Sequence, residues 1–345
     1  MSDPIRVGIA GLGRSGWSIH ARLLAMLPEK FSVVAVVDAD ETRRNEAVDR
    51  FDCMAYTSYG DLLADPAVEL VILALPSHLH ADLSIAALDV GKHVVCEKPM
   101  ATSLADADRM VAAAEQRDHL LTIFQNRRYD AHFAKVRSLI DSGALGRIVQ
   151  IRVTASNFGR RWDWQTLKEF GGGTLNNTGP HFIDLVMQLF GEDEPDQVYC
   201  HLDRTLTLGD ADDHVKLVFK GEGTPTVDME MSAACAFPGE FWHIMGTKGG
   251  LTGTLQALHW RVVDESKLAP RVLDPSPTEG RSYNRDEITW IEDSWTADEY
   301  DGPGYEGYYI DLYETIRNGA PLVVTPQSVR RVIRMMEQCR EISPV

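Results

Sequence analysis

The chain has 345 residues, of which 44% are hydrophobic and 25% charged, a composition typical of a globular protein long enough for two domains. Its formal net charge of −17 repels nucleic acids and anionic lipids, so we expect neither as a main partner. The five cysteines form no CxxC pair, which argues against a disulfide framework and against a metal site. The N-terminus lacks a signal-peptide pattern, and no apolar run reaches the ~18 residues of a membrane span. We therefore expect a cytoplasmic protein.

The first 124 residues alternate short apolar strands with helices. Near-continuous apolar runs such as 31–37 are typical of parallel strands that are covered on both faces. Strands alternating with helices indicate βαβ units, so this part is predicted to be a doubly wound parallel sheet. The predicted strands are 5–10, 31–37, 68–75, 92–96 and 120–124, and the predicted helices are 15–27, 81–89 and 104–117.

The pattern changes near residue 147, where alternating, β-rich runs begin. These runs predict a mostly antiparallel open sheet within a second domain, residues 125–345, that binds substrate and includes the C-terminal helices. The stretch 268–304 is rich in Pro, Asp, Glu and Gly and is expected to form long loops. The predicted strands are 148–156, 197–206, 215–219, 226–234, 241–246 and 258–263, and the helices are 130–142, 180–190, 305–318 and 326–342.

A glycine-rich hexad follows the first predicted strand and opens the first predicted helix. In this context the GxGxxG spacing is typical of dinucleotide binding. Its first glycine permits a tight turn, its second lets the backbone approach a pyrophosphate, and its third allows close packing of helix on strand. The sequence therefore predicts a Rossmann domain that binds NAD(P). The hexad consists of Gly11, Leu12, Gly13, Arg14, Ser15 and Gly16.

The choice between the two cofactors depends on the end of the second strand. Asp38 lies there, where a carboxylate accepts hydrogen bonds from the adenosine ribose and repels a 2′-phosphate. Arg43 and Arg44 follow and can either accommodate a phosphate or lie on a solvated helix face, the commoner arrangement. We therefore expect NAD, with NADP as the weaker alternative.

Two further segments carry candidate catalytic residues. Lys98 directly follows the strand 92–96, and ligands of open α/β sheets bind outside the carboxyl ends of their strands. His181 falls in the first turn of the helix 180–190, whose dipole favours a neutral imidazole. Asp184 lies three residues later on the same helix face, where it is expected to orient the ring of His181. Lys98 and His181 together can supply a base and a hydrogen bond for oxidation of a secondary alcohol.

The whole chain resembles the glucose–fructose oxidoreductase / inositol dehydrogenase / rhizopine catabolism (Gfo/Idh/MocA) family. The resemblance rests on VGIAGLGRSG, LPSHLHADLSIAALDVGKHVVCEKPMA, QNRRYDAHFAKVRSLIDSGALGRIVQIRV and GGGTLNNTGPHFIDL. The second of these segments, with its EKP element, is highly specific. The resemblance implies an NAD(P)-dependent oxidoreductase of sugars, inositols or related polyols. It also implies a homodimer or homotetramer joined through the faces of the second-domain sheets.

Several residues match positions with known roles in that family. Lys98 matches the catalytic lysine and His181 the catalytic histidine. Where the family usually has aspartate four residues before the histidine, this chain has Asn177, which cannot carry a charge but can bind substrate hydroxyls. This departure moves the base role onto His181 or Lys98. The positions that match the lining of the cofactor pocket are Leu75, Pro76, His80 and Glu97.

An aromatic and polar cluster precedes the glycine run at 171–173. Aromatic faces stack on sugar C–H surfaces, so Asn157 and Trp164 are expected to bind substrate, although a core or interface loop is an equal alternative. If the substrate is acidic, Arg128, Arg160 and Arg161 are expected to bind its anion. The cluster comprises Asn157, Arg160, Arg161, Trp162, Asp163 and Trp164.

Three functions remain open from the sequence. The first is a dehydrogenase that transfers hydride between a secondary alcohol of a sugar or inositol and NAD. The second is NAD-dependent glycoside cleavage, through transient oxidation at C3 and elimination, which some relatives catalyse. The third is a non-catalytic NAD-binding sensor. The retained Lys98 and His181 favour the dehydrogenase over the sensor, and Asn177 keeps glycoside cleavage open.

Overall fold

A computed structural model describes residues 3–278 and 283–345, and within them the strands form two sheets. The first sheet is parallel, with the order β3-β2-β1-β4-β5-β6. The strand order reverses between β1 and β4, which places a ligand crevice at the carboxyl ends of these strands. Its strands are β1 (Ile5–Ala10), β2 (Phe31–Val37), β3 (Met54–Tyr56), β4 (Leu70–Leu73), β5 (His93–Cys96) and β6 (Leu121–Ile123).

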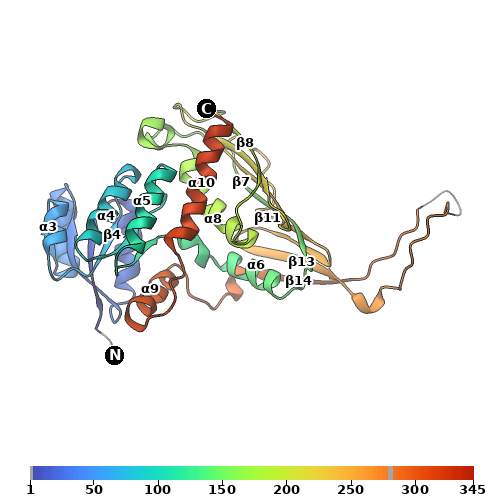
Figure 1. Ribbon diagram of the computed structural model, residues 1–345, viewed down its shortest axis with the longest axis horizontal. Helices are drawn as coiled ribbons and strands as arrows, with labels where there is room; N and C mark the ends of the chain where they lie inside the picture. The colour runs from blue at the N-terminus through green and yellow to red at the C-terminus, as the bar shows by residue number, and fades with distance from the viewer. Residues whose placement is uncertain (1–2, 279–282) are drawn as a thin grey trace.

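Helices cover both faces of this sheet, as the alternating pattern predicts (Figure 1). The predicted helix 15–27 begins as a π-helical turn, η1 (Gly16–Ala21), and continues as α1 (Arg22–Ala25). Two helices and β3, between residues 41 and 64, were not predicted. The first of these helices, α2, buries only Ala47 and so lacks the apolar stripe that marks a surface helix. The other helices of this region are α2 (Glu41–Phe51), α3 (Tyr59–Ala64), α4 (His80–Asp89) and α5 (Leu104–Glu115).

The second sheet is mostly antiparallel, as expected, with the order β14-β13-β12-β11-β7-β10-β9-β8. Among the described strand pairs of this second sheet, only β7 and β10 run parallel. Its strands are β7 (Ile148–Ser156), β8 (Gln197–Asp203), β9 (His214–Lys220), β10 (Thr226–Ser232), β11 (Trp242–Gly246), β12 (Gly249–Gly253), β13 (Ala257–Val263) and β14 (Trp290–Thr296).

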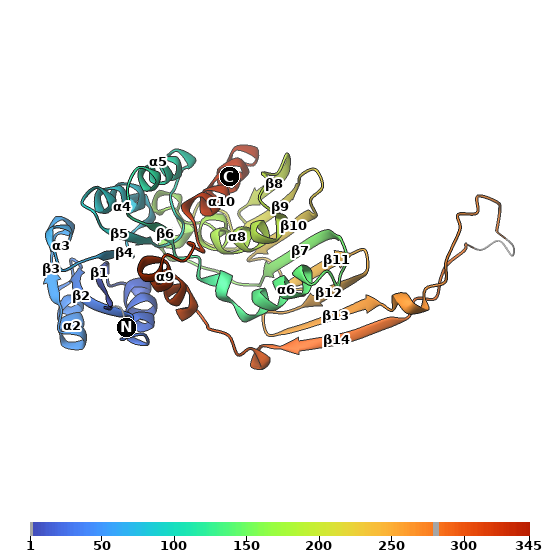
Figure 2. The ribbon, with the colours of Figure 1, turned by 60° about the horizontal axis from the view of Figure 1, so that its bottom comes forward.

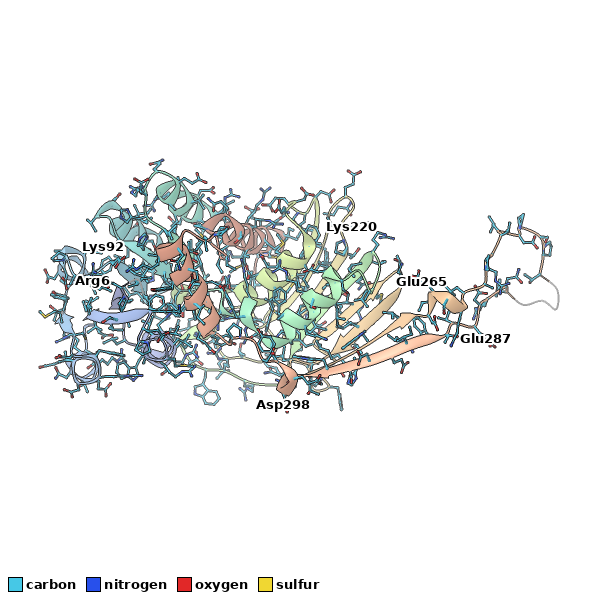
Figure 3. The ribbon with its side chains drawn as sticks, turned by 90° about the horizontal axis from the view of Figure 1, so that it is seen from below. Arg6, Lys92, Lys220, Glu265, Glu287 and Asp298 are labelled. Atoms are coloured by element: carbon cyan, nitrogen blue, oxygen red, sulfur yellow. The ribbon has the colours of Figure 1, made fainter. Side chains whose placement is uncertain are left out.

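The expectation of loops throughout 268–304 was wrong at β14, which pairs with β13 along its length. In β14 only Trp295 is buried, so the alternation that marks a half-buried strand is absent. Residues 264–278 and 283–289, between these strands, leave the sheet as a long projection with Glu265 and Glu287 at its base (Figures 2 and 3), and the part of the loop prediction at 279–282 lies outside the described residues.

One face of the second sheet is covered by helices that also reach the first domain. They include α6 (Ala131–Asp141), α7 (Thr174–Asn177), α8 (Gly179–Phe190) and α10 (Pro326–Ile342). In Figure 1, α8 and α10 lie between the two sheets, and α9 (Glu306–Asn318) packs beside the first sheet. Thr325 caps α10, accepting a hydrogen bond from the Ser328 N–H at 3.2 Å. None of the helices in the described part of the chain is long and apolar enough to cross a membrane.

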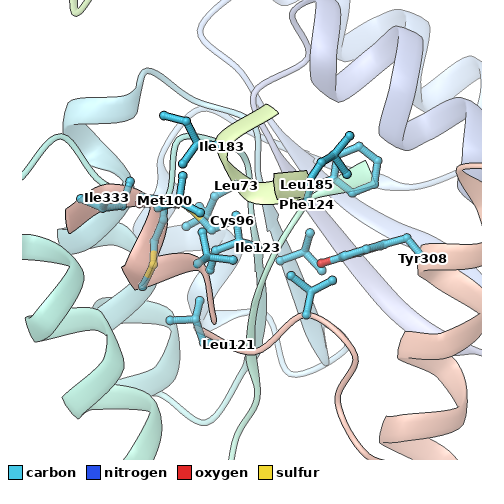
Figure 4. Close-up of a cluster of buried hydrophobic side chains, with 14 of the residues drawn as sticks. Leu73, Cys96, Met100, Leu121, Ile123, Phe124, Ile183, Leu185, Tyr308 and Ile333 are labelled. Carbon is cyan, nitrogen blue, oxygen red and sulfur yellow. Dashed lines mark hydrogen bonds between the residues drawn. The ribbon is translucent and has the colours of Figure 1, made fainter. Parts of the chain in front are cut away.

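A shared core joins the ends of β4, β5 and β6 to the helices α8, α9 and α10 (Figure 4). Because these side chains are buried, the strand that leads to Lys98 and the helix that carries His181 are packed into one unit. The side chains labelled there are Leu73, Cys96, Met100, Leu121, Ile123, Phe124, Ile183, Leu185, Tyr308 and Ile333.

Candidate functional site

The glycine loop has the geometry that a dinucleotide requires. Gly11 has a φ of +91°, and a Cβ there would lie 2.5 Å from the carbonyl oxygen of Ala74. A Cβ at Gly16 would lie 1.8 Å from the Gly11 oxygen, so both positions exclude any larger residue. At Gly13 a Cβ would meet nothing within 4 Å, which leaves the backbone open toward a ligand. The loop therefore fits the pyrophosphate of NAD(P).

Asp38 is held beside this loop. Its Oδ2 accepts a hydrogen bond from the Leu12 N–H at 2.7 Å, and its Oδ1 accepts one from the Asp40 N–H at 2.9 Å. Arg43 Nη1 lies 3.7 Å from Asp38 Oδ2. Arg44 instead donates to the carbonyl oxygens of Asp38 and Ala39, at 2.8 and 2.9 Å. The carboxylate is thus fixed at the end of β2, next to the loop that would hold the cofactor phosphates.

Lys98 lies just past the carboxyl end of β5, after a buried glutamate. Its Nζ donates to the carbonyl oxygen of Asn177 at 3.2 Å, and its peptide bond to Pro99 is cis. Burial, helped by the positive charges of Arg14 and Arg127, lowers the pKa of Lys98, while the Glu97 carboxylate opposes this. The amine is therefore easier to deprotonate than that of a solvated lysine.

His181 lies at the start of α8 and is neutral, as predicted, but mainly for a different reason. Burial, together with the positive charges of Lys98 and Arg127, lowers the pKa of His181 to about 3. Its Nδ1 is buried without a hydrogen-bond partner among the described residues. The tautomer protonated on Nε2 avoids burying an unpaired N–H. His181 thus presents an N–H donor from Nε2.

The side chain of Asn177 faces a loop. Its Nδ2 donates to the carbonyl oxygen of Gln165 at 3.3 Å, while its backbone oxygen accepts from Lys98. No hydrogen bond joins this amide to His181 in the described part of the chain. The three predicted catalytic residues are therefore neighbours, but Asn177 acts on Lys98 through its backbone.

The expected pairing of Asp184 with His181 was wrong. The Asp184 carboxylate accepts two hydrogen bonds from Arg128, at 2.8 Å from Nε and 2.6 Å from Nη2. Arg128 also donates to Ser328 Oγ at 3.0 Å, and its side chain is only 5% exposed. The charge of Arg128 is thus satisfied by a buried carboxylate, which argues against its binding a substrate anion, and that role stays a prediction.

The residues matched to the cofactor pocket divide into two groups. Leu75 and Pro76 follow β4 directly, at the same edge of the sheet as the glycine loop. His80 is buried, and its ring nitrogens lie 2.8 and 2.9 Å from the carbonyl oxygens of Pro99 and Leu75. The covered His80 side chain therefore ties the two loops together, and its match to a cofactor-lining position stays a prediction. Glu97 is likewise buried behind Lys98.

The aromatic and polar cluster forms a loop next to α7. The carbonyl oxygen of Gln165 accepts from the Gly173 N–H at 2.9 Å, which places the loop against the helix that carries Asn177. Trp164 is 59% exposed, and Asn157 uses its backbone to contact Ser232 and Cys235. No hydrogen bond links their side chains to Lys98 or His181 among the residues described. Their role in binding substrate stays a prediction.

Two polar residues that follow β6, Gln125 and Arg127, were not predicted as part of the site. Gln125 is 1% exposed; its Nε2 donates to the Pro180 carbonyl oxygen at 3.2 Å, and its Oε1 has no partner among the described residues. Arg127 stacks on the ring of Phe182 at 5.2 Å, and its charge acts on both Lys98 and His181. The rule that selected Lys98, a polar residue at the carboxyl end of a parallel strand, applies to both residues.

Comparison with known proteins agrees with this geometry. Residues 5–125 match the model of an oxidoreductase family with an NAD-binding Rossmann fold, and residues 133–252 match the GFO/IDH/MocA C-terminal domain. A myo-inositol 2-dehydrogenase of Thermotoga maritima is 30% identical over 252 residues, 71% of this chain and 74% of that protein. The chain belongs to the GFO/IDH/MocA oxidoreductase family.

Other relatives match over different lengths. The scyllo-inositol 2-dehydrogenase (NADP(+)) IolW of Bacillus subtilis is 29% identical, over 99% of this chain and 94% of that protein. Two oxidoreductases of Schizosaccharomyces pombe, described as uncharacterized, are 35% and 33% identical, but the chain spans only 52% of the length of each.

Solved structures share the fold. The oxidoreductase yvaA of Bacillus subtilis has a TM-score of 0.84 at 24% identity, covering 99% of this chain and 97% of that one. The WlbA dehydrogenase of Bordetella pertussis, solved with NADH and UDP-GlcNAcA, has a TM-score of 0.77 at 21% identity, with coverage of 98% and 97%.

Proposed function

We propose that this oxidoreductase is an NAD-dependent dehydrogenase that oxidises a secondary alcohol of an inositol or a related sugar. The observation that carries the proposal is the placement of the Lys98 amine, which lies 3.2 Å from the Asn177 carbonyl oxygen at the sheet edge that also holds the glycine loop. The names of the Thermotoga maritima and Bacillus subtilis relatives favour an inositol as substrate.

Lys98 and His181 have different roles in this proposal. When bound, the nicotinamide supplies the hydride acceptor. Lys98, with its lowered pKa, takes the hydroxyl proton as a neutral amine. His181 remains neutral and donates its Nε2–H to the substrate oxygen, where negative charge develops. The side chain of Asn177 cannot take a proton. Its backbone carbonyl oxygen accepts a hydrogen bond from the Lys98 amine and orients it.

Asp38 supports NAD as the cofactor. Its carboxylate is fixed by two backbone N–H groups, so it stays beside the position that the adenosine ribose occupies in this fold. Arg43 lies against the carboxylate and provides the alternative interaction with a 2′-phosphate. One relative is an NADP(+) enzyme, and we propose that this chain differs from that relative in preferring NAD.

The test begins with fluorescence titration of NAD and NADP, followed by an absorbance screen for NADH. The screen includes inositols, aldoses, uronic acids and aryl glycosides. Tight NAD binding and NADH formation on a free inositol or sugar are expected. Release of an aglycone without net NADH would overturn the proposal in favour of glycoside cleavage, and NAD binding with neither product would favour a sensor.

We also propose that copies of the chain associate through the open face of the second sheet. That face carries a groove of about 550 Å³ lined by residues of β11 to β14, including Trp260 and Trp290. Light scattering is expected to give a dimer or tetramer, and a monomer at micromolar concentration would contradict the proposal. The cytoplasmic location expected from the sequence also stays a prediction.

A further inference from the structure

A series of buried hydrogen bonds connects helix α9 to the backbone of Lys98. The hydroxyl of Tyr309 lies 2.6 Å from Nδ1 of His20, and Nε2 of His20 lies 3.2 Å from Oε1 of Glu97. Oε2 of Glu97 accepts a hydrogen bond from the Lys98 N–H at 2.9 Å. His20 belongs to the π-helical turn that follows the glycine loop. The chain thus links three separate segments behind the proposed active site.

The positions of the protons in this chain follow from its partners. Tyr309 is fully buried, and among the described residues its hydroxyl has no hydrogen-bond partner other than His20. The phenol must therefore donate to Nδ1, since its proton would otherwise be buried without an acceptor. A neutral imidazole that accepts at Nδ1 carries its proton on Nε2 and donates it to Glu97. Tyr309 therefore donates to His20, and His20 donates to Glu97.

Glu97 is the charged end of the chain. Burial alone would raise the pKa of Glu97, but the hydrogen bond from His20 and the positive charge and backbone N–H of Lys98 hold it well below its usual value. The charged and titratable groups that act on Lys98 are Glu97, Arg14 and Arg127, and the neutral His181 is its neighbour. Only Glu97 stabilises the ammonium form of Lys98 among these groups.

We propose that Tyr309 and His20 are positioning residues that hold the Glu97 carboxylate, and through it Lys98, in the arrangement needed for proton transfer. The proposal rests on Lys98 being the proton acceptor of the proposed dehydrogenase. Within this series of hydrogen bonds, Tyr309 and His20 bond only to each other and to Glu97, not to a group on the open side of the site. Their influence on the reaction passes through Glu97.

Neighbouring tyrosines provide a matched test. Tyr308 is also buried and donates to Thr122 Oγ1 at 3.0 Å, in the same aromatic cluster but with no hydrogen bond to Glu97 or His20. Tyr309→Phe is expected to lower kcat about tenfold, the order of loss that a small misplacement of reacting groups causes. Tyr308→Phe is expected to keep the wild-type kcat, and both variants are expected to bind NAD normally.

The pH profile distinguishes positioning from a general loss of packing. Without the phenol, the His20 ring loses the partner that fixes Nε2 as the donor to Glu97. The Glu97 carboxylate is then no longer held against Lys98, so the pH at which kcat/KM rises should shift in Tyr309→Phe. Equal profiles and equal kcat in the Tyr308 and Tyr309 variants would overturn the proposal.

His20 variants and a chemical probe complete the test. His20→Gln keeps an N–H donor for Glu97 and is expected to retain more activity than His20→Leu. Competitive acetylation of Lys98 with acetic anhydride, followed by mass spectrometry, reports the protonation of its amine without turnover. The pH at which acetylation of Lys98 begins should differ between Tyr309→Phe and wild type, and an unchanged profile would refute the proposal. If the wild type shows no turnover, the proposed function fails, while acetylation still tests the chain.

Discussion

The two ends of the first sheet contain similar residues in opposite situations. At the amino end, Lys92 Nζ donates to the carbonyl oxygens of Asp65 and Val68, at 2.9 and 2.6 Å, and Glu69 forms a paired hydrogen bond with Arg317. Figure 3 places Lys92 and Arg6 together in the first domain, remote from the projection of the second sheet.

The carboxyl end is different. There the Oε1 of Gln125 and the Nδ1 of His181 are buried without partners among the described residues. Native proteins pair almost all buried polar groups, so unpaired groups at one edge mark a place where stability has been given up for another purpose. The comparison indicates that residue type alone does not identify a site. Unpaired atoms such as Ser84 Oγ and Arg331 Nε also occur on other elements, so the unpaired groups support the proposed site only together with their place at the carboxyl edge.

The largest expected effect separates the lysines at the two ends of β5. Lys98→Met should lower kcat about thousandfold, the order attributed to general acid–base catalysis, with little change in Tm. Lys92→Met should leave kcat near wild type but lower Tm, because it leaves two carbonyl oxygens without their donor. Steady-state kinetics and thermal unfolding of both variants check this, and a similar loss of kcat in both would remove the distinction.

A second prediction concerns the base. His181→Asn should lower kcat about hundredfold, as loss of a donor to a developing oxyanion does. Since the pKa of His181 is about 3, the imidazole is neutral throughout the assay range and contributes no inflection near pH 6.5. The rate of oxidation should instead rise with pH as Lys98 loses its proton, in wild type and variant alike. An inflection near pH 6.5 that vanishes in the variant would make His181 the base.

A smaller effect is expected in cofactor choice. Asp38→Asn keeps an oxygen that can accept from the Leu12 N–H but removes the negative charge. NAD binding should weaken about tenfold, as expected for loss of a charge-assisted hydrogen bond, and NADP binding should improve. Asp40→Asn, at the cap of α2, is the control and should change neither affinity. Fluorescence titration measures both, and unchanged selectivity in the Asp38 variant would contradict this role.

The smallest effect tests the amino end. His93 Nδ1 accepts from the Leu120 N–H at 3.0 Å, and burial, helped by His119, lowers the pKa of His93 to about 4. Because the unfolded chain binds a proton near pH 6.5 and the folded chain does not, this group destabilises the fold as pH falls from about 6.5 toward 4. His93→Asn keeps an acceptor without titrating, so its Tm should fall less steeply, by a few degrees. His78→Asn, exposed, should match the wild type.

Local patterns predicted most of the fold. The strands buried on both faces and the capped helices α5 and α10 have patterns that depend only on neighbouring residues. β12 was missed because three of its five residues are glycine, and β14 because only Trp295 is buried. Both strands are set by pairing with β13, a constraint that no local period records.

The site divides in the same way. The glycine loop, Asp38 and Lys98 were identified because each depends on its position at a strand end. The error at Asp184 arose because spacing of three residues puts two side chains on one face of a helix but does not reveal a competing partner. Arg128, 56 residues earlier, occupies that carboxylate. The contact between His20 and Tyr309, 289 residues apart, has no signal in either local sequence.

The π-helical turn at Gly16–Ala21 has a consequence for how such chains are aligned. A π-turn accommodates one residue more than an α-turn, and each helical residue turns the next side chain by about 100°. Deleting a single residue in this turn would preserve the GxGxxG spacing yet rotate His20 away from Glu97. A one-residue gap at this point in an alignment would therefore mark a homologue that supports its catalytic loop by other means, even where every glycine and the lysine coincide.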